Sequence, residues 1–409
     1  MDRNISGDVI AKYLTNFTPL TRLLFVICGA VLIHLSLGSY HTFGNMLPYI
    51  ASYMKNYTDS SVNHEILIWI PTFQSCFPFA MVIGGLLSSK LGLRFATSLG
   101  CFIMASGVFL SYWTIQISFL AFLITYGMMF GLGQGIAYVL TISCVINWAP
   151  KHVGLVSGIV AAGFGFSSSI FAPLQTIYLN PLNCKPTVSA YFTDIDLVRR
   201  VPSAFYIFAI VYAIMQIIGL IFICNPINLV CSYLEFSKNN ERDDEVLENG
   251  MVDLREESIS LSPSEILKTS TFLWLFCALF CCSFYGNMFY NLYKTFGETF
   301  IDDDLFMAYA FSIASMCNAL ARIGWGILTD QISFQKSLSI ATLLATVLLL
   351  TMPLTPKGGK WLYFMNLMLI CLAATHALFI TASVKCFGTD HKSTNYGCLI
   401  FSTVCILFF

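Results

Sequence analysis

Long apolar runs alternate with short polar segments along almost the whole chain. A helix needs about 20 consecutive apolar residues to cross a bilayer. On that measure the pattern predicts membrane-spanning helices at about residues 21–54, 66–88, 95–114, 117–147, 153–178, 203–223, 270–293, 305–328, 337–354, 361–385 and 396–409. The first and fourth runs are longer than a bilayer is thick, so these helices tilt or continue into solvent. The pattern therefore predicts an all-α, multi-pass membrane protein.

A polar segment at residues 224–269 separates the first six runs from the later ones. Its central part, residues 235–257, holds nine acidic and three basic residues, as is typical of a flexible solvated linker. Ser262-Pro-Ser-Glu265 has the residue types of a helix N-terminus. We therefore expect a six-helix bundle at 1–223, a cytoplasmic acidic linker at 224–269 and a second, truncated bundle at 270–409.

Composition agrees with the membrane prediction, and the positions of the basic residues add an orientation. Hydrophobic residues make up 57% of the chain and charged residues only 11%, against about 25% charged residues in soluble domains. With the N-terminus inside, the inner segments carry 13 Lys and Arg and the outer segments carry 7. Basic residues favour the cytoplasmic side, so we expect a cytoplasmic N-terminus, and we expect the plasma membrane as the location. The sequon Asn56-Tyr-Thr58 then lies outside.

Arg322 lies within the predicted helix at 305–328, where a charge is unfavourable. An arginine at the centre of a bilayer costs at least ~2.5 kcal/mol, so it normally faces a protein or water interior. Because a guanidinium pairs well with a carboxylate, Arg322 is a candidate to bind an organic anion. Asn318, one helical turn earlier, could orient the guanidinium or donate a second hydrogen bond. The alternatives are that Arg322 snorkels or pairs structurally, and that Asn318 bonds a neighbouring helix.

Two segments in equivalent positions of the two halves share one pattern. Each has a glycine, a polar residue four positions later, a small residue and then a base, as in Gly85…Ser89…Gly92…Arg94 and Gly326…Asp330…Ser333…Lys336. A repeat between half-chains is characteristic of secondary transporters. The pair resembles the loop motif of the major facilitator superfamily. Asp330 keeps the aspartate of that motif, whereas Ser89 replaces it in the first copy, so we expect a weaker helix-end contact there.

Further stretches resemble, within that superfamily, the oxalate–formate antiporters and their monocarboxylate-transporter relatives. These stretches are Gly38–Tyr49, Gly131–Tyr138, Trp148–Gly158, Asn318–Gly326 and Phe387–Ser402. The stretch around Arg322 looks like the span that carries the substrate-binding arginine of these families. The resemblance implies twelve helices in two six-helix bundles that rock about a central site. It also implies transport of small organic anions, by exchange or with a proton.

The chain departs from those families at three positions that bear on function. It stops at Phe409, inside the predicted eleventh helix, so we expect the twelfth helix and part of the eleventh to be missing. Val404 stands where the oxalate branch carries a second cation, and a single cation suits a monoanion better than a dianion. Asn318 stands where the proton-coupled branch carries an aspartate, and the loss of that carboxylate argues against proton coupling here.

Neutral and titratable side chains complete the predicted site. Tyr40, Gln134 and Tyr138 offer hydrogen-bonding groups from the first bundle, although tyrosine is also common helix filler. His41 and His376 are candidates to carry a proton; the alternative for each is a neutral histidine bonded between helices. The residues expected to bind the substrate are therefore Arg322, Asn318, Tyr40, His41, Gln134, Tyr138 and His376.

These features predict a secondary active transporter of small organic anions such as lactate, pyruvate or formate, in which Arg322 pairs the carboxylate during alternating access. The alternative is a non-transporting membrane sensor or receptor, or a truncated inactive isoform that keeps the fold. An enzyme is disfavoured because no span carries paired carboxylates or a nucleophile with its base. Most of the cysteines lie in apolar runs, and none has metal spacing with histidines, so we expect no metal and no cofactor. The expected partners are the anion, with or without protons, and the lipid bilayer, but no nucleic acid.

Overall fold

The computed structural model describes residues 9–14, 16–74, 77–182, 184, 191–226, 260–298, 300–301, 304–373 and 377–405. Every regular element in these ranges is a helix, as the sequence predicts. The acidic stretch at 235–257 and the candidate His376 lie outside the described residues. The start of the helix at Ser262 is described and has the predicted N-terminal arrangement, in which Ser262 and Glu265 bond each other reciprocally. The hydrogen bonds from Ser262 hold the pKa of Glu265 below its usual range.

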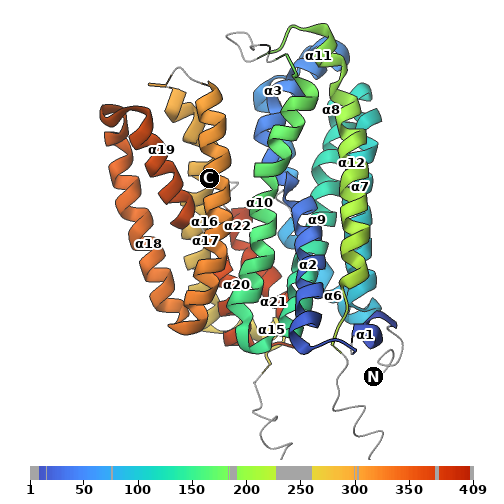
Figure 1. Cartoon of the computed structure of the whole chain (residues 1–409), viewed down its shortest axis with the longest axis vertical. Coiled ribbons are helices and arrows are strands. Elements are labelled where there is room, and N and C mark those ends of the chain that lie inside the picture. The colour runs from blue at the N-terminus through green and yellow to red at the C-terminus, as the bar shows by residue number, and fades with distance from the viewer. Residues whose placement is uncertain are drawn as a thin grey trace, which may run out of the picture.

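The first set of helices precedes the acidic stretch and forms one side of the molecule (Figure 1). In chain order it comprises α1 (Val9–Leu14), α2 (Pro19–Leu37), η1 (Gly38–Thr42), α3 (Phe43–Tyr53), η2 (Met54–Thr58), α4 (His64–Leu67), α5 (Trp69–Gln74), α6 (Phe77–Leu91), α7 (Leu93–Ile117), α8 (Phe119–Phe122), η3 (Leu123–Met129), α9 (Phe130–Trp148), η4 (Pro150–His152), α10 (Val153–Leu179), α11 (Ile195–Arg199) and α12 (Val201–Phe222). We call this set the first group.

The second set follows the acidic stretch and forms the other side. It comprises α15 (Pro263–Ile266), α16 (Ser270–Glu298), α17 (Asp304–Gln331), α18 (Phe334–Thr351), η5 (Met352–Leu354), α19 (Thr355–Ala373), α20 (Ala377–Phe387), α21 (Lys392–Ile400) and α22 (Ser402–Cys405). We call it the second group. Within the described residues, eight stretches are long and apolar enough to cross a membrane.

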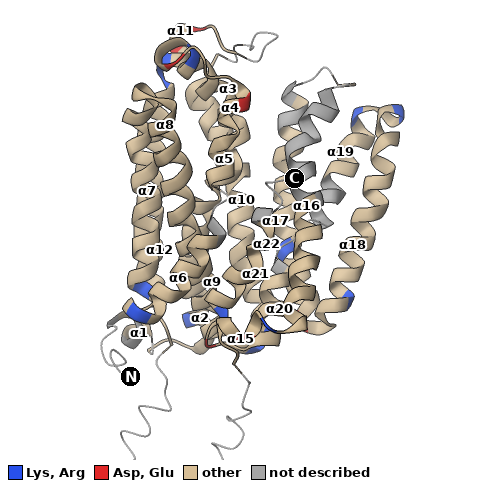
Figure 2. Cartoon of the chain, turned by 180° about the vertical axis from the view of Figure 1, so that it is seen from behind, with Lys and Arg blue, Asp and Glu red and all other residues tan. Residues whose placement is uncertain are grey.

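The outward surfaces of these helices are apolar. Phe102 on α7, Ile217 on α12 and Trp274 on α16 are each exposed over at least 62% of their surface. Figure 2 shows that the charged residues lie mainly at the two ends of the helices. A soluble protein rarely exposes apolar surface so extensively. The described helices therefore carry a lipid-facing belt between two polar ends.

The first predicted span is one stretch, Pro19–Thr58, but it is not a uniform α-helix. A 3₁₀ segment, η1, interrupts it at Gly38. A Cβ atom at this position would lie 2.1 Å from the carbonyl oxygen of Phe164 on α10. Only glycine therefore allows the two backbones to come so close, and the sequence pattern had not predicted this break.

The two groups meet chiefly through α10 against α17 and through α6 against α21. The N-terminal helix α1 and the end of the linker, α15, lie at the same end of the molecule, whereas α3 and α11 lie at the other (Figure 1). We call the first of these the linker end. The arrangement agrees with placing the N-terminus and the linker on one side of the membrane, and which side that is remains a prediction.

The repeated glycine motifs occupy matching positions at the linker end. A Cβ on Gly326 would lie 2.2 Å from the Gly154 carbonyl oxygen at the start of α10, and a Cβ on Gly85 would lie 2.2 Å from Thr394 Oγ1 at the start of α21. Each motif glycine thus packs against the first turn of a helix from the other group. Such close approach is the usual role of small residues between membrane helices.

The polar residues of the two motifs differ as predicted. Asp330 accepts hydrogen bonds from the backbone N–H groups of Gly154 (3.1 Å) and Leu155 (2.9 Å), and it pairs with Lys385 at 3.2 Å. A carboxylate at a helix N-terminus is stabilised by the helix dipole. Ser89 instead donates to the Leu86 carbonyl on its own helix. Only the Asp330 copy therefore links the two groups through a charged contact.

Gly326→Ala is expected to open the linker end. The added methyl group would clash with the Gly154 carbonyl, and overpacking of this kind costs about 1–3 kcal/mol. Spin labels at the exposed positions Phe95 and Gln335 would report a longer and broader distance distribution. Gly324→Ala is the matched control on the same helix, since no atom lies within 4 Å of the place that its added methyl group would take. Equal distributions in both variants would contradict this packing role.

Candidate functional site

Arg322 lies on α17 where that helix packs against α10 of the first group. Its side chain is buried, with 9% of its surface exposed. Nε donates a hydrogen bond to Asn318 Oδ1 at 3.1 Å, and Nη1 donates to the Ala161 carbonyl oxygen on α10, also at 3.1 Å. Both acceptors are neutral, and within the described ranges no carboxylate forms an ion pair with Arg322. The positive charge is therefore held in place but not neutralised.

Two glycines of α10 bring the guanidinium against the other group. A Cβ on Gly158 would lie 2.6 Å from the Arg322 carbonyl oxygen, which is too short for any side chain. A Cβ on Gly165 would lie 3.5 Å from Arg322 Cζ, an ordinary contact distance. The guanidinium thus lies directly on the surface of α10, at the boundary between the two groups.

Aromatic rings from three helices of the first group gather beside this boundary. The ring of Tyr138 on α9 lies 4.8 Å from that of His34 on α2 and 5.2 Å from that of Phe164 on α10. The charge of Arg322 acts electrostatically on His34 and Tyr138, and also on Tyr396 of α21. The site is therefore built from α2, α9 and α10 on one side and from α17 and α21 on the other.

His34 presents one ring nitrogen without a partner. Its Nδ1 lies 3.0 Å from the Ala30 carbonyl oxygen, which can only accept a hydrogen bond, so Nδ1 carries the proton. Thr141 Oγ1 lies 3.2 Å from the same nitrogen. Nε2 is buried and makes no hydrogen bond within the described structure. In the neutral ring Nε2 is a hydrogen-bond acceptor.

Among the other buried polar atoms without a hydrogen-bond partner in the described structure, two lie on α9 and α21, which carry Tyr138 and Tyr396. They are the Tyr396 hydroxyl and Gln134 Oε1, on side chains that are 3% and 1% exposed. Buried polar groups are nearly always hydrogen-bonded, so an exception calls for a water or a ligand. Tyr396 lies within electrostatic reach of both Arg322 and Tyr138. Its hydroxyl is therefore a candidate to bond a molecule held by the guanidinium.

The structure brings together some of the residues expected from the sequence. Arg322, Asn318 and Tyr138 meet at the boundary, as described above. Gln134 lies one turn before Tyr138 on α9. Tyr40 and His41 are half-buried on η1 and reach the cluster through Phe164, whose ring lies 5.1 Å from that of His41. The seventh expected residue, His376, is not among the described ones.

His34 and Tyr396 are candidate site residues that are not among the seven expected from the sequence. For His34 the available signal was its spacing of seven residues from His41, which places both on one helical face. Both rings do lie near Phe164, at 6.5 Å and 5.1 Å. For Tyr396 the signal was a phenol within a family-like stretch of a membrane helix. Neither signal identifies a partner on another helix.

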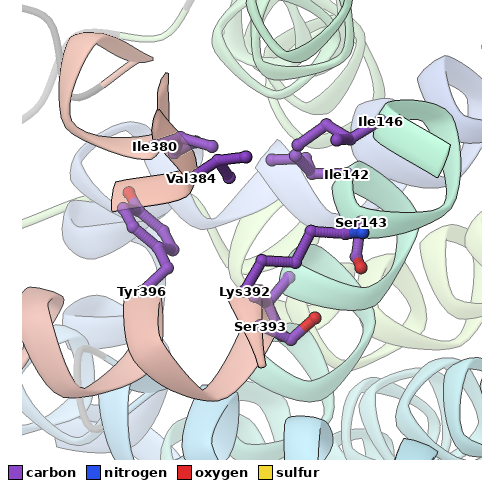
Figure 3. A pocket seen from close by; sticks show the side chains of 9 residues that line it. Ile142, Ser143, Ile146, Ile380, Val384, Lys392, Ser393 and Tyr396 are labelled. Atoms are coloured by element: carbon purple, nitrogen blue, oxygen red, sulfur yellow. The ribbon is translucent and has the colours of Figure 1, made fainter. Parts of the chain in front are cut away.

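The groups are in close contact between the site and the linker end. Figure 3 shows Ile142 and Ile146 of α9 facing Ile380 and Val384 of α20, with Tyr396 beside them. The space they enclose is about 10 Å³, which is room for about one water. Below it, Lys392 Nζ donates to Asn147 Oδ1 across the boundary. The contacts of Asp330 lie at the same end, so this structure is closed there.

Comparison with known proteins supports a transport role. The family model described as Major Facilitator Superfamily matches residues 26–406. Apicoplast pyruvate carrier 1 of Toxoplasma gondii is 25% identical, over 90% of this chain and 79% of that protein. The oxalate:formate antiporter of Oxalobacter formigenes is 22% identical, over 82% of this chain and 73% of that protein. Monocarboxylate transporter 13 of Bos taurus is 29% identical over a shorter stretch, 25% of this chain and 24% of that protein.

Solved structures show the same fold at low identity. The human organic anion transporter MFSD10 superposes with a TM-score of 0.65 at 14% identity, covering 95% of this chain and 92% of that chain. The proton:xylose symporter XylE superposes with a TM-score of 0.61 at 11% identity, covering 96% and 87%. These likenesses establish the architecture alone, because the identities are too low to carry over a substrate.

Proposed function

The chain belongs to the Major Facilitator Superfamily, and we propose that it is a secondary carrier of small monocarboxylates that binds the carboxylate at Arg322. One observation carries the proposal. The guanidinium is buried at the boundary of the two groups, and its hydrogen bonds within the described residues go to the neutral oxygens of Asn318 and Ala161. A buried cation without a counter-ion is unfavourable, and a carboxylate would relieve that cost by bidentate pairing.

The position of Arg322 suggests how binding could be coupled to movement. Its bond to Ala161 joins α17 to α10, which belong to different groups. A carboxylate arriving at the guanidinium would compete with the Ala161 carbonyl for the same N–H. Binding would thus exchange a contact between the groups for a contact with the substrate, as alternating access at a central site requires.

The neutral groups around Arg322 favour a substrate with an oxygen next to its carboxylate. The hydroxyls of Tyr138 and Tyr396 can donate to a keto oxygen, as in pyruvate. The unpartnered Nε2 of His34 can accept from a hydroxyl, as in lactate. We therefore propose 2-oxo and 2-hydroxy monocarboxylates as the preferred class, with formate and acetate bound more weakly.

Uptake into proteoliposomes tests this function directly. Purified protein should give saturable uptake of labelled pyruvate that unlabelled lactate inhibits more strongly than formate, whereas protein-free liposomes should give none. Preloading with pyruvate distinguishes exchange, and an inward proton gradient distinguishes proton coupling. Binding of pyruvate without flux would instead support the sensor alternative. No binding and no flux for any of these anions would refute the proposed substrate class.

Tyr138→Phe and Tyr396→Phe are each expected to raise the KM for pyruvate. Losing one neutral hydrogen bond costs about 0.5–1.5 kcal/mol, which corresponds to a KM that is roughly twofold to twelvefold higher. Formate, which has no oxygen beyond its carboxylate, should be less affected. Tyr126→Phe is the control, because Tyr126 is buried among Phe122, Phe130 and Phe205, away from the site. If the KM for pyruvate changes no more in these two variants than in the control, the two hydroxyls do not bind the substrate.

The location of the protein is a separate proposal. We keep the predicted cytoplasmic N-terminus, but the two relatives named as apicoplast carriers favour an organellar membrane over the plasma membrane expected from the sequence. A fluorescent fusion expressed in the source cells, imaged with markers of both membranes, distinguishes these locations.

A further inference from the structure

A second cavity lies in the first group, at the end of the molecule opposite the linker end. It has a volume of about 190 Å³. Its lining comes from the end of α3, η2, the end of α7, α11 and the start of α12, and comprises Tyr53, Tyr57, Tyr112, Gln116, Arg199, Pro202 and Ser203. Pockets for drug-sized ligands typically measure about 300–1,000 Å³. This cavity therefore suits a compact polar group and not a larger molecule.

The lining offers several hydrogen-bond donors that are not otherwise used. In the described part of the chain, no hydrogen bond engages the hydroxyls of Tyr53, Tyr57 or Tyr112. The guanidinium of Arg199 forms no hydrogen bond or ion pair there either. The nearby carboxylate of Asp194 accepts from the Leu197 N–H and does not line the cavity. Three phenols and one guanidinium are a donor set that suits a phosphate.

The surroundings place this cavity at the lipid-facing side of the first group. Next to Tyr112, the rings of Trp113, Phe109 and Tyr206 pack together on α7 and α12. These three rings are exposed over 45%, 36% and 42% of their surface. Exposed aromatic rings near the ends of membrane helices mark the level of the lipid headgroups. Among the described residues, none of those that line the cavity belongs to the second group, so the cavity is distinct from the site at Arg322.

We propose that this cavity binds the phosphate of an anionic phospholipid headgroup. Arg199 would pair with the phosphate oxygens, the hydroxyls of Tyr57 and Tyr112 would donate to them, and the acyl chains would lie along the exposed rings of Trp113 and Tyr206. An anionic lipid is favoured over a zwitterionic one, because a choline ammonium would lie close to the guanidinium. Bound there, the lipid would join α3, α7 and α12 at this end of the first group. The proposal is independent of the substrate of the carrier.

Native mass spectrometry of the full chain, titrated with phosphatidylglycerol in a neutral detergent, tests the proposal. The wild-type chain should retain one phosphatidylglycerol more tightly than phosphatidylcholine. Arg199→Gln should weaken its Kd by about tenfold or more, the change expected for one charge-assisted contact. Tyr57→Phe combined with Tyr112→Phe should weaken it several-fold and keeps the test valid if Arg199→Gln does not fold. Arg200→Gln is the matched control, because the neighbouring guanidinium does not line the cavity.

Each other outcome would overturn the assignment. Unchanged phosphatidylglycerol affinity in both cavity variants would place the lipid elsewhere. Retention of phosphatidylcholine as tight as that of phosphatidylglycerol would show that the cavity does not select anionic lipids. Displacement of phosphatidylglycerol by millimolar inorganic phosphate would identify a site for free phosphate instead of a lipid.

Discussion

Arg322→Gln reduces saturable pyruvate uptake to the level of protein-free liposomes, if Arg322 binds the carboxylate. Glutamine can still bond its neighbours, but the carboxylate would then be desolvated without a cation. Removing one partner of a buried charge pair costs about 2–5 kcal/mol or more, which corresponds to a loss of roughly 30-fold to several thousand-fold in kcat/KM. Uptake of labelled pyruvate at several concentrations measures this loss.

Arg322→Lys separates the need for charge from the need for geometry. Lysine keeps the charge but cannot form the planar bidentate pair, nor bond Asn318 and Ala161 in the same way. We expect uptake between that of the wild type and that of Arg322→Gln. Lys336→Gln is the control, since it removes one exposed positive charge at the linker end without touching the site. If Arg322→Gln transports as well as this control, the proposed binding role is wrong.

Asp330→Asn shifts the protein away from the state that is closed at the linker end. Asparagine keeps one acceptor for the start of α10 but loses the negative charge that faces the helix N-terminus and Lys385. A charge at a helix N-terminus contributes up to about 2 kcal/mol, and hydrogen bonds to a charged group contribute about 1.5–3 kcal/mol. A loss of even about 1.4 kcal/mol would shift the equilibrium tenfold. Labels at Phe95 and Gln335 should report longer distances, and the uptake rate should fall.

The repeat supplies an internal control for this prediction. Ser89 occupies the equivalent position of the first motif, and its hydroxyl donates to the Leu86 carbonyl oxygen within α6. Ser89→Ala should therefore leave both the distances and the uptake unchanged. Similar behaviour of Ser89→Ala and Asp330→Asn would show that the charged contact does not hold the linker end closed. A change confined to uptake, without a change in distance, would point to an effect on the site instead.

Local sequence patterns were sufficient to predict the features that depend on residues close together in the chain. Apolar runs of about 20 residues determine membrane helices, because a bilayer leaves no other way to satisfy the backbone. Asn318 was a candidate to orient Arg322, because residues four apart lie on one helical face, and its Oδ1 accepts a hydrogen bond from Arg322 Nε at 3.1 Å. The start of α15 at Ser262 could also be predicted, because the hydrogen bonds at its N-terminus join residues only three positions apart.

These local patterns could not predict contacts between segments that are far apart in the sequence. The sequence placed a buried charge at Arg322, but only the tertiary structure decided that its second bond goes to Ala161, 161 positions earlier. Likewise, His34 and Tyr396 became candidates for the site only in the folded structure, in which the charge of Arg322 acts on both. Similarly, only the tertiary structure shows that Gly38 lies against the Phe164 carbonyl oxygen of α10, where a side chain would not fit. Hydropathy and residue spacing indicate which face of a helix is apolar. A binding site depends instead on which helices lie side by side, and side-chain packing between the helices decides which ones do.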